Sequence, residues 1–384
     1  MEKTIKRLVL LLIISTSFCI AACEKKTEAG AEANVPADRP DDQPKAFRDY
    51  GTHLDLWEHA HLAEIDHHGL YIEFGTPARQ KYTYGDWRSG WGKDGVASVD
   101  RFTNATSEAA RVYFRAEKSE PLTLRVRLKP VGTGVVTAYL NGEALPATRL
   151  SGNEFKDYDV AIPAERVQMG ENRLMFRFGG STLVNGEQVA ANVASIRLIP
   201  ASEVATGKDY DAPRFAELRT ETAVGGVQRR ALAVPSPTTL SYYVDVPAGG
   251  ALGFSVGVTG DKPKSGKASV VITPEGGQPK EHFSTDLTTT WKDQVVALDE
   301  YAGKVVRIEL RAVGDVGAGR VAWSTPAILL KEKPLAKAPK TAKNVVVVLI
   351  DTLGARHLKA FNPKTRVKTP VIDQIAQEGT VLEA

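Results

Sequence analysis

One carboxylate near the end of the chain stands where a metal ligand is expected. The residues from Asn344 to Asp351 read Asn-Val-Val-Val-Val-Leu-Ile-Asp, so an apolar, mostly β-branched run leads directly to Asp351. Such a run predicts a strand that is buried on both faces of a parallel sheet. Open α/β sheets bind ligands at the carboxyl ends of their strands, and Ca²⁺ prefers carboxylate oxygen. Asp351 is therefore a candidate metal ligand; the alternative is that it caps the following turn.

Aromatic side chains near residue 90 could bind sugar. Tyr84, Trp87 and Trp91 lie in a glycine-rich stretch, and aromatic faces at the rim of a sandwich can stack on sugar rings. We treat Trp87 and Trp91 as candidate glycan-stacking residues. The alternative, which the sequence favours, is that they close the end of a sandwich.

Four histidines gather within a short segment, namely His59, His61, His67 and His68. Histidine is a common metal ligand. No cysteine lies among these four, however, and acidic residues are interspersed with them. We therefore predict a solvated entry segment rather than a metal site.

Short strands must position most of these residues. Leu122–Leu128 alternates apolar and polar residues, which predicts a half-buried strand, and Asn141-Gly142 predicts a tight turn. Residues 210–331 repeat the pattern, with a charged hairpin tip expected at Pro263–Lys267. No long helical period occurs in either part. We predict two jelly-roll-like β-sandwiches, at residues 47–200 and 210–331.

The first of these segments resembles the galactose-binding-like jelly roll. Ile72-Glu73-Phe74-Gly75 is similar to the opening strand of such modules, and Tyr139-Leu140-Asn141-Gly142 to their strand and turn. Val160 to Asn172 resembles the return made of a polar strand, a proline and Gly-x-Asn. These motifs are mainly structural, so the resemblance implies a fold more than an activity.

The last segment, residues 344–384, resembles the opening of the sulfatase domain in the alkaline phosphatase superfamily. That opening has a hydrophobic strand, Asp-Thr-Leu, a histidine, then Thr-Pro, an aspartate and a helix ending in Glu-Gly. The matching residues here are Asp351-Thr352-Leu353, His357, Thr369-Pro370, Asp373 and Glu378-Gly379. The match has departures, because many sulfatases have a second aspartate where Thr352 stands, and many relatives have Arg and Asp where this chain has Gly354 and Arg356.

The sulfatase resemblance implies a site and a cofactor. A divalent metal, Ca²⁺ by the ligand type, would be bound in part by Asp351, with Thr352 and His357 adjacent to the site. In the family, the nucleophile lies on a later segment, so we expect it beyond Ala384. The fold class expected for the whole is thus two β-sandwiches, a Lys/Pro linker at 332–343 and the truncated start of an α/β domain at 344–384.

The N-terminus predicts an exported protein. Lys3, Lys6 and Arg7 precede a short apolar run, which is too short to span a bilayer. Ile20-Ala21-Ala22-Cys23 resembles the lipobox of bacterial lipoproteins. The resemblance implies a signal peptide at 1–22, acylation of Cys23, and an anchor at the outer membrane, cell surface or periplasm. Residues 23–46 are expected to be a disordered tether. A plain secretory signal is the alternative.

Charge and motifs together leave two functions open. Lys and Arg number 49 and Asp and Glu 46, so the net charge of +3 gives no basis for nucleic-acid binding. The first hypothesis is the N-terminal part of a lipid-anchored, metal-dependent sulfate-ester or phosphate-ester hydrolase, acting on a sulfated or phosphorylated small molecule or glycan. The alternative is a non-catalytic surface lipoprotein whose sandwiches bind glycan or cell-wall partners.

Overall fold

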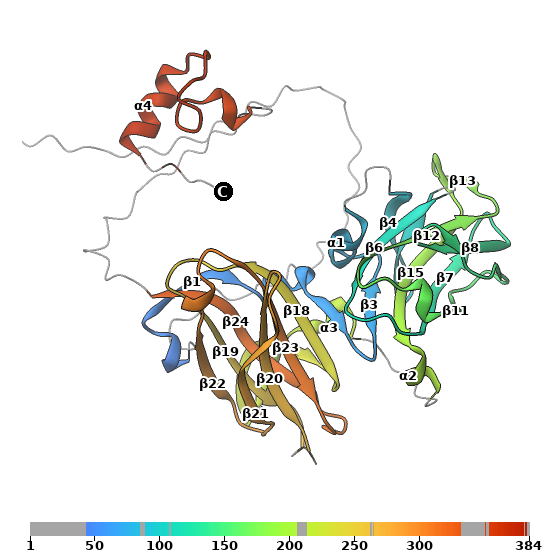
Figure 1. The fold of residues 1–384 in the computed structure, drawn as a ribbon, viewed down its shortest axis with the longest axis horizontal. Helices are drawn as coiled ribbons and strands as arrows, with labels where there is room; N and C mark the ends of the chain where they lie inside the picture. Colours follow the sequence, from blue (N-terminus) through green and yellow to red (C-terminus); the bar gives the residue numbers. More distant parts are fainter. Residues whose placement is uncertain are drawn as a thin grey trace, which may run out of the picture. The chain divides into compact units, whose positions relative to one another are not determined.

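The computed structural model describes residues 44–84, 89–106, 109–205, 213–261, 263, 265–331, 350, 353–379 and 381 (Figure 1). The chain divides into two units, Pro36–Lys333 and a second unit made of Met1–Val35 with Pro334–Ala384. Several sequence predictions lie outside the described residues: the signal peptide, Cys23 and almost all of the tether, Trp87, the linker 332–343, the strand ending at Ile350, and Asp351 with Thr352.

The first sandwich packs two antiparallel sheets on one core. One sheet has the order β10-β8-β12-β6, with β9 also paired to β8. The bounds are β6 (Ala110–Ala116), β8 (Val135–Leu140), β9 (Glu143–Ala144), β10 (Thr148–Arg149) and β12 (Gly170–Phe178). The facing strands are β3 (Leu70–Glu73), β4 (Trp91–Ala97), β5 (Asp100–Ala105), β7 (Leu122–Pro130), β11 (Lys156–Ile162) and β15 (Ala191–Pro200). The inward side chains of both sheets form one hydrophobic cluster.

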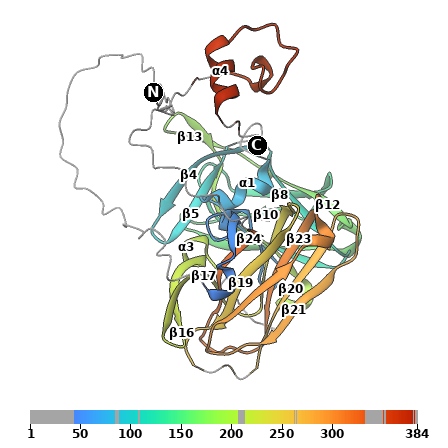
Figure 2. The same cartoon turned by 90° about the vertical axis from the view of Figure 1, so that its left-hand side faces the viewer.

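The second sandwich is built in the same way. Its first sheet has the order β16-β17-β24-β19-β22, and β1 pairs with β24. The bounds are β1 (Tyr50–Asp55), β16 (Arg219–Val224), β17 (Val227–Val234), β19 (Gly250–Val258), β22 (Lys292–Ala297) and β24 (Val321–Lys331). The facing strands, of which β23, β20 and β21 lie side by side in Figure 2, are β18 (Thr238–Asp245), β20 (Lys267–Pro274), β21 (Lys280–Asp286) and β23 (Val305–Val313).

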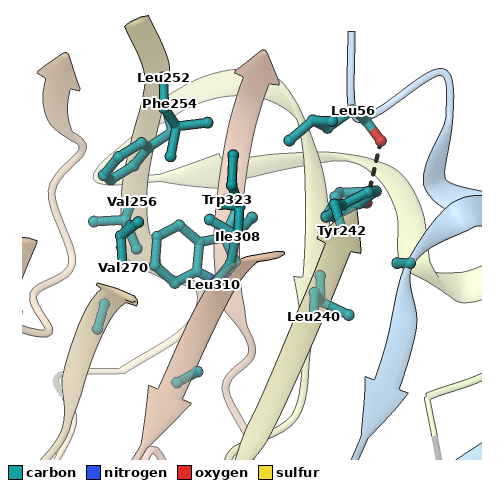
Figure 3. Close-up of a cluster of buried hydrophobic side chains, with 14 of the residues drawn as sticks. Leu56, Leu240, Tyr242, Leu252, Phe254, Val256, Val270, Ile308, Leu310 and Trp323 are labelled. Atoms are coloured by element: carbon teal, nitrogen blue, oxygen red, sulfur yellow. Dashed lines mark hydrogen bonds between the residues drawn. The ribbon is translucent and has the colours of Figure 1, made fainter. Parts of the chain in front are cut away.

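Trp323 occupies the centre of the second core. Its side chain is fully buried, and its ring lies 5.4 Å from that of Phe254 (Figure 3). In the same cluster, Tyr242 donates a hydrogen bond from its hydroxyl to the carbonyl oxygen of Leu56, at 3.2 Å. The core of this sandwich therefore includes residues from a segment far earlier in the chain.

One short strand joins the sandwiches into a continuous sheet. β2 (Glu64–Asp66) pairs with β3 of the first sandwich and with β18 of the second. The sheet consequently runs β11-β7-β15-β3-β2-β18-β23-β20-β21. An ion pair between Arg307 on β23 and Glu117 after β6 also crosses the junction. The two sandwiches are thus coupled by backbone hydrogen bonds as well as by side chains.

The segment before β2 belongs to the second sandwich, which differs from the boundary predicted at residue 47. β1 hydrogen-bonds to the last strand, β24, and Phe47 packs on Ala327 and Leu329. Leu56 and Trp57 are buried in the second core. The physical reason is a pairing between strands about 270 residues apart along the chain, which no local pattern reveals.

Helices are short and lie at connections, except at the end of the chain. In order they are η2 (Lys45–Phe47), η3 (Ala60–Leu62), η4 (Pro77–Arg79), α1 (Gln80–Thr83), η5 (Ala164–Arg166), α2 (Ala201–Ala205), α3 (Phe215–Leu218), η6 (Asp299–Tyr301), η7 (Ala355–His357) and α4 (Pro370–Glu378), where η marks a 3₁₀ helix. The hairpin of β13 (Thr182–Val184) and β14 (Glu187–Val189) completes the strands. In the described part of the chain, no helix is both long and apolar enough to cross a membrane.

Helix α4 forms where the sequence predicts an amphipathic helix. Pro370 is its first residue, a position that proline tolerates. The Thr369 hydroxyl before it donates to the Asp373 carboxylate, at 3.0 Å. None of its residues is buried among the described residues, and Val371 and Ile375 are exposed. The described residues contain no parallel sheet, so the α/β domain stays a prediction.

A half-buried lysine lies at the junction of the sandwiches. Lys81 on α1 donates from Nζ to the carbonyl oxygens of Ala78 and His61, at 2.8 and 3.1 Å. Burial lowers the pKa of Lys81 to about 7, although the nearby Glu64 carboxylate opposes that shift. Burial also raises the pKa of Glu64. The junction therefore contains a lysine that loses its proton far below its usual pH.

We expect Lys81 to make stability depend on pH. Between its folded pKa of about 7 and the ordinary lysine pKa of 10.5, the unfolded chain binds more protons here than the folded chain does. The free energy of unfolding should therefore rise with pH, by up to about 1.4 kcal/mol per unit. Urea melts at pH values from about 7.5 to 9 give the free energy of unfolding at each pH. Its slope against pH should be smaller for Lys81→Met than for the parent. Lys118→Met, at an exposed site, is the control, and equal slopes in Lys81→Met and the parent would refute this role.

Candidate functional site

Trp91 is a core residue and cannot stack on a sugar. Its side chain is 4% exposed, and its ring lies 4.4 Å from that of Phe74. The indole Nε1 donates to the carbonyl oxygen of Arg111, at 2.7 Å. For Trp91 the structure therefore supports the alternative that the sequence favours over the glycan-stacking candidate, because the buried ring fills the end of the sandwich. Trp87, its companion in that prediction, lies outside the described residues.

Among the described residues of that stretch, Tyr84 is an aromatic residue that faces solvent. It follows α1 as the C-terminal capping residue, with a positive φ of 48°, and is 64% exposed. Its ring lies 4.6 Å from the ring of Tyr113 on β6, tilted by 44°. Its hydroxyl donates to the Glu171 carboxylate on β12, at 2.7 Å, and this hydrogen bond raises the pKa of Tyr84. Two tyrosines thus form a fixed aromatic pair at the surface.

Tyr113 stands on the outer face of the sheet β10-β8-β12-β6. Strand alternation buries Val112 and Phe114 in the core and turns Tyr113 outward. The same alternation on the neighbouring strands defines the outer face, which we call the tyrosine–arginine face. Its residues are Tyr84 together with Arg111, Tyr113, Arg115, Thr137, Tyr139, Arg149, Glu171, Arg173, Met175 and Arg177.

Cross-strand register sets the order of side chains on this face. Arg173 on β12 stands directly opposite Tyr113 on β6. On the other side of β12, Met175 stands opposite Tyr139 on β8. The Arg177 guanidinium lies over the Tyr139 ring, 5.4 Å from its centroid. Tyr113 therefore has Arg173 beside it and Tyr139 has Arg177 beside it, so that aromatic rings and guanidinium groups alternate across the face.

The sequence-predicted histidine segment is only partly solvated. His67 is buried, and its Nδ1 lies 2.6 Å from the carbonyl oxygen of Pro237 in the second sandwich. His68 Nδ1 lies 3.0 Å from a Glu203 carboxylate oxygen. In the parts of the chain that are described, no group of three His, Cys, Asp or Glu side chains could hold a metal ion. His67 thus contacts the second sandwich, and His68 contacts helix α2.

The predicted metal site is not assembled by the described residues. His357 ends η7, and its Nε2 accepts from the Nε of the adjacent Arg356, at 3.2 Å. Asp351 and Thr352 lie outside the described residues. Residues that would hold Ca²⁺ are thus not brought together in the described part, and we derive no chemical step through a metal.

Comparison with known proteins gives weak structural likenesses. No family model matches the chain, and a search of the curated proteins finds no match. Among solved structures, TmCBM61 in complex with β-1,4-galactotriose is 19% identical over 28% of this chain and 72% of that one, with a TM-score of 0.22. A family 35 carbohydrate binding module from an environmental isolate is 14% identical over 34% of this chain and 93% of that one, with a TM-score of 0.23. The CBM22 tandem of Paenibacillus barcinonensis Xyn10C is 14% identical over 64% of this chain and 94% of that one, with a TM-score of 0.23. Since these TM-scores are low, the assignment of two β-sandwiches rests on the strand pairing described above.

Proposed function

We propose that the first sandwich is a glycan-binding module and that the tyrosine–arginine face is its binding surface. The observation that carries the proposal is the Tyr84–Tyr113 pair, which is held at the surface by a hydrogen bond to Glu171. Aromatic rings that are fixed in place offer an apolar surface at little entropic cost. Sugars present both an apolar ring face and hydroxyl groups, so a surface of tyrosines and polar side chains complements them.

A second tyrosine extends the proposed surface across the sheet. Tyr113 and Tyr139 lie on the two strands that flank β12, and their partners on β12 are two residues apart. Strand spacing and rise place their Cα atoms roughly 12 Å apart. The two rings can therefore contact different sugars of one chain, which favours an oligosaccharide or polysaccharide over a single sugar.

The N-terminal sequence fits this proposal. The leader at residues 1–22, followed by Cys23, predicts export and lipid anchoring, and exported proteins meet cell-surface and environmental glycans. We propose a surface lipoprotein that holds glycan through its first sandwich. The ester-hydrolase hypothesis stays a prediction that depends on Asp351, which lies outside the described residues.

Tyr113→Ala should weaken glycan binding about tenfold or more, which corresponds to roughly 1.4 kcal/mol. The substitution removes one ring of the pair. Because Tyr113 is half-buried on the outer face of the sheet and lies outside the core, the fold should be retained. Isothermal titration with a panel of polysaccharides gives the affinities, and thermal melts check that the variant is folded. The matched control is Tyr158→Ala, on β11 of the opposite sheet. An unchanged affinity in Tyr113→Ala would remove this face from the proposal.

A further inference from the structure

We propose that the tyrosine–arginine face selects polyanionic glycans, namely polysaccharides that carry sulfate or carboxylate groups. This inference rests on the proposed glycan-binding function and adds the chemical class of the ligand. It starts from the charges at the outward positions of one sheet. Those positions carry five arginines, Arg111, Arg115, Arg149, Arg173 and Arg177, and a single acid, Glu171.

The opposite sheet of the same sandwich provides an internal comparison. There the Arg125 guanidinium donates two hydrogen bonds to Asp159, both at 2.8 Å. Arg127 likewise donates to both carboxylate oxygens of Asp100, at 2.8 and 3.0 Å. Arg125 and Arg127 therefore each have a bidentate carboxylate partner within the protein, which is a common way to satisfy a guanidinium.

Three arginines of the tyrosine–arginine face, Arg115, Arg173 and Arg177, differ from these two. Among the described residues, Arg115, Arg173 and Arg177 form no ion pair with any carboxylate, and all three are exposed. The Glu171 carboxylate, which stands opposite Arg115, accepts from Tyr84 instead. This face thus presents planar guanidinium groups that are free to bind an external anion bidentately.

The arrangement of the arginines matches a repeating ligand. Arg173 lies beside Tyr113, and Arg177 lies over Tyr139, so the face contains two tyrosine–arginine pairs. The two arginines are four residues apart on β12, which places their Cα atoms roughly 13 Å apart. A sugar that stacks on each ring would bring an anionic substituent to the neighbouring guanidinium. Repetition of the pair suits a polymer with regularly spaced charges.

Other polyanions share part of this chemistry. Single-stranded nucleic acid also combines stacking on aromatic rings with contacts to arginine, and anionic lipid surfaces attract basic patches. The export predicted from residues 1–22 and the overall charge of only +3 favour a glycan over nucleic acid. The side-by-side placement of ring and cation favours a glycan over a lipid surface, which needs no aromatic platform.

The test compares matched polymers that differ in charge. The full chain is titrated with dextran and dextran sulfate, and with galactan and polygalacturonate, at low and moderate NaCl concentrations. We expect each anionic polymer to bind at least tenfold more tightly than its neutral partner, with an affinity that falls as salt rises. A preference for sulfate over carboxylate, or the reverse, identifies the group and supports the proposal in either case.

Substitutions separate the charge preference from glycan binding itself. Arg173→Gln with Arg177→Gln should reduce the preference for the anionic polymer over its neutral partner to threefold or less. Arg125→Gln, whose arginine is paired with Asp159, is the matched control and should keep the preference. Equal affinity for neutral and anionic polymers would overturn this inference and leave the proposed function standing. Binding of none of the polymers would overturn both. Equal or tighter binding of single-stranded DNA or of phosphatidylserine vesicles would also overturn it.

Discussion

A chain cut to residues 213–331 will fail to fold, although it contains every strand that the sequence pattern assigns to the second sandwich. The cut removes β1, which pairs with the second half of β24. It also removes Leu56, Trp57 and Ile65 from the core. Each large apolar side chain contributes roughly 1.5–3 kcal/mol when buried. Together these losses approach the whole stability of about 5–15 kcal/mol that a domain has.

Circular dichroism melts test this expectation directly. A chain of residues 44–331 should give a β-type spectrum and a cooperative transition, whereas residues 213–331 should give neither. Because Tyr242 bonds to the carbonyl oxygen of Leu56, the shorter chain also leaves a buried hydroxyl without a partner. Cooperative melting of the shorter chain at the temperature of the longer one would show that the N-terminal segment is dispensable.

Trp323→Ala should destabilise the second sandwich by about 3–5 kcal/mol. The indole is fully buried at the centre of the core, in contact with Phe254, so its removal leaves a cavity that the surrounding strands cannot fill. Because β2 couples the two sandwiches through one sheet, the melting of the first sandwich should shift with that of the second.

A second tryptophan of the same sandwich is the matched control. Trp291 is half-buried at the surface, where its Nε1 donates to the carbonyl oxygen of Val227 at 2.8 Å. Trp291→Ala should cost less than half as much as Trp323→Ala in urea melts. Similar losses in the two variants would mean that burial at the centre of the core does not set the stability of this sandwich.

Local periodicity predicted most of the strands of both sandwiches. The alternating residues Leu122–Leu128 form β7, with the leucines and Val126 buried. Asn141 and Gly142 both adopt positive φ, at 53° and 93°, as a tight turn between β8 and β9 requires. The Asn172 side chain is buried and bonds to Gln168, Gly170 and Asn141. The Gly-x-Asn motif therefore holds the return loop in place.

Pairing between distant strands could not be predicted. Pro263–Lys267 was expected to be a hairpin tip, but the strands on either side, β19 and β20, belong to different sheets. The connection therefore crosses the sandwich. Segment 47–65 was assigned to the wrong sandwich for the same reason, since its partner is β24. Periodicity along a strand predicts which side chains are buried, but it does not predict which other strand lies beside it.

The tyrosine–arginine face is hidden in the sequence for a related reason. Tyr113, Tyr139 and Arg173 come from three strands, and only their register brings them together. Within its own strand, each of these residues has the pattern of a solvent-facing position in a half-buried strand. The sequence makes Trp87 and Trp91 the candidate stacking residues instead, because tryptophan is rare and large, yet Trp91 is buried in the core. Of that stretch, Tyr84 is the described residue that contributes to the candidate site.

Hydroxyl-radical footprinting of Tyr84 and Tyr113, with and without a polysaccharide that binds, tests the central claim most directly. Tyr84 is well exposed in the free protein, so its modification is readily measured. We expect saturating polysaccharide to slow modification of both tyrosines several-fold, while Trp291 in the second sandwich is modified at an unchanged rate. Unchanged modification of Tyr84 and Tyr113 under conditions where binding is complete would contradict the claim that this face holds the glycan.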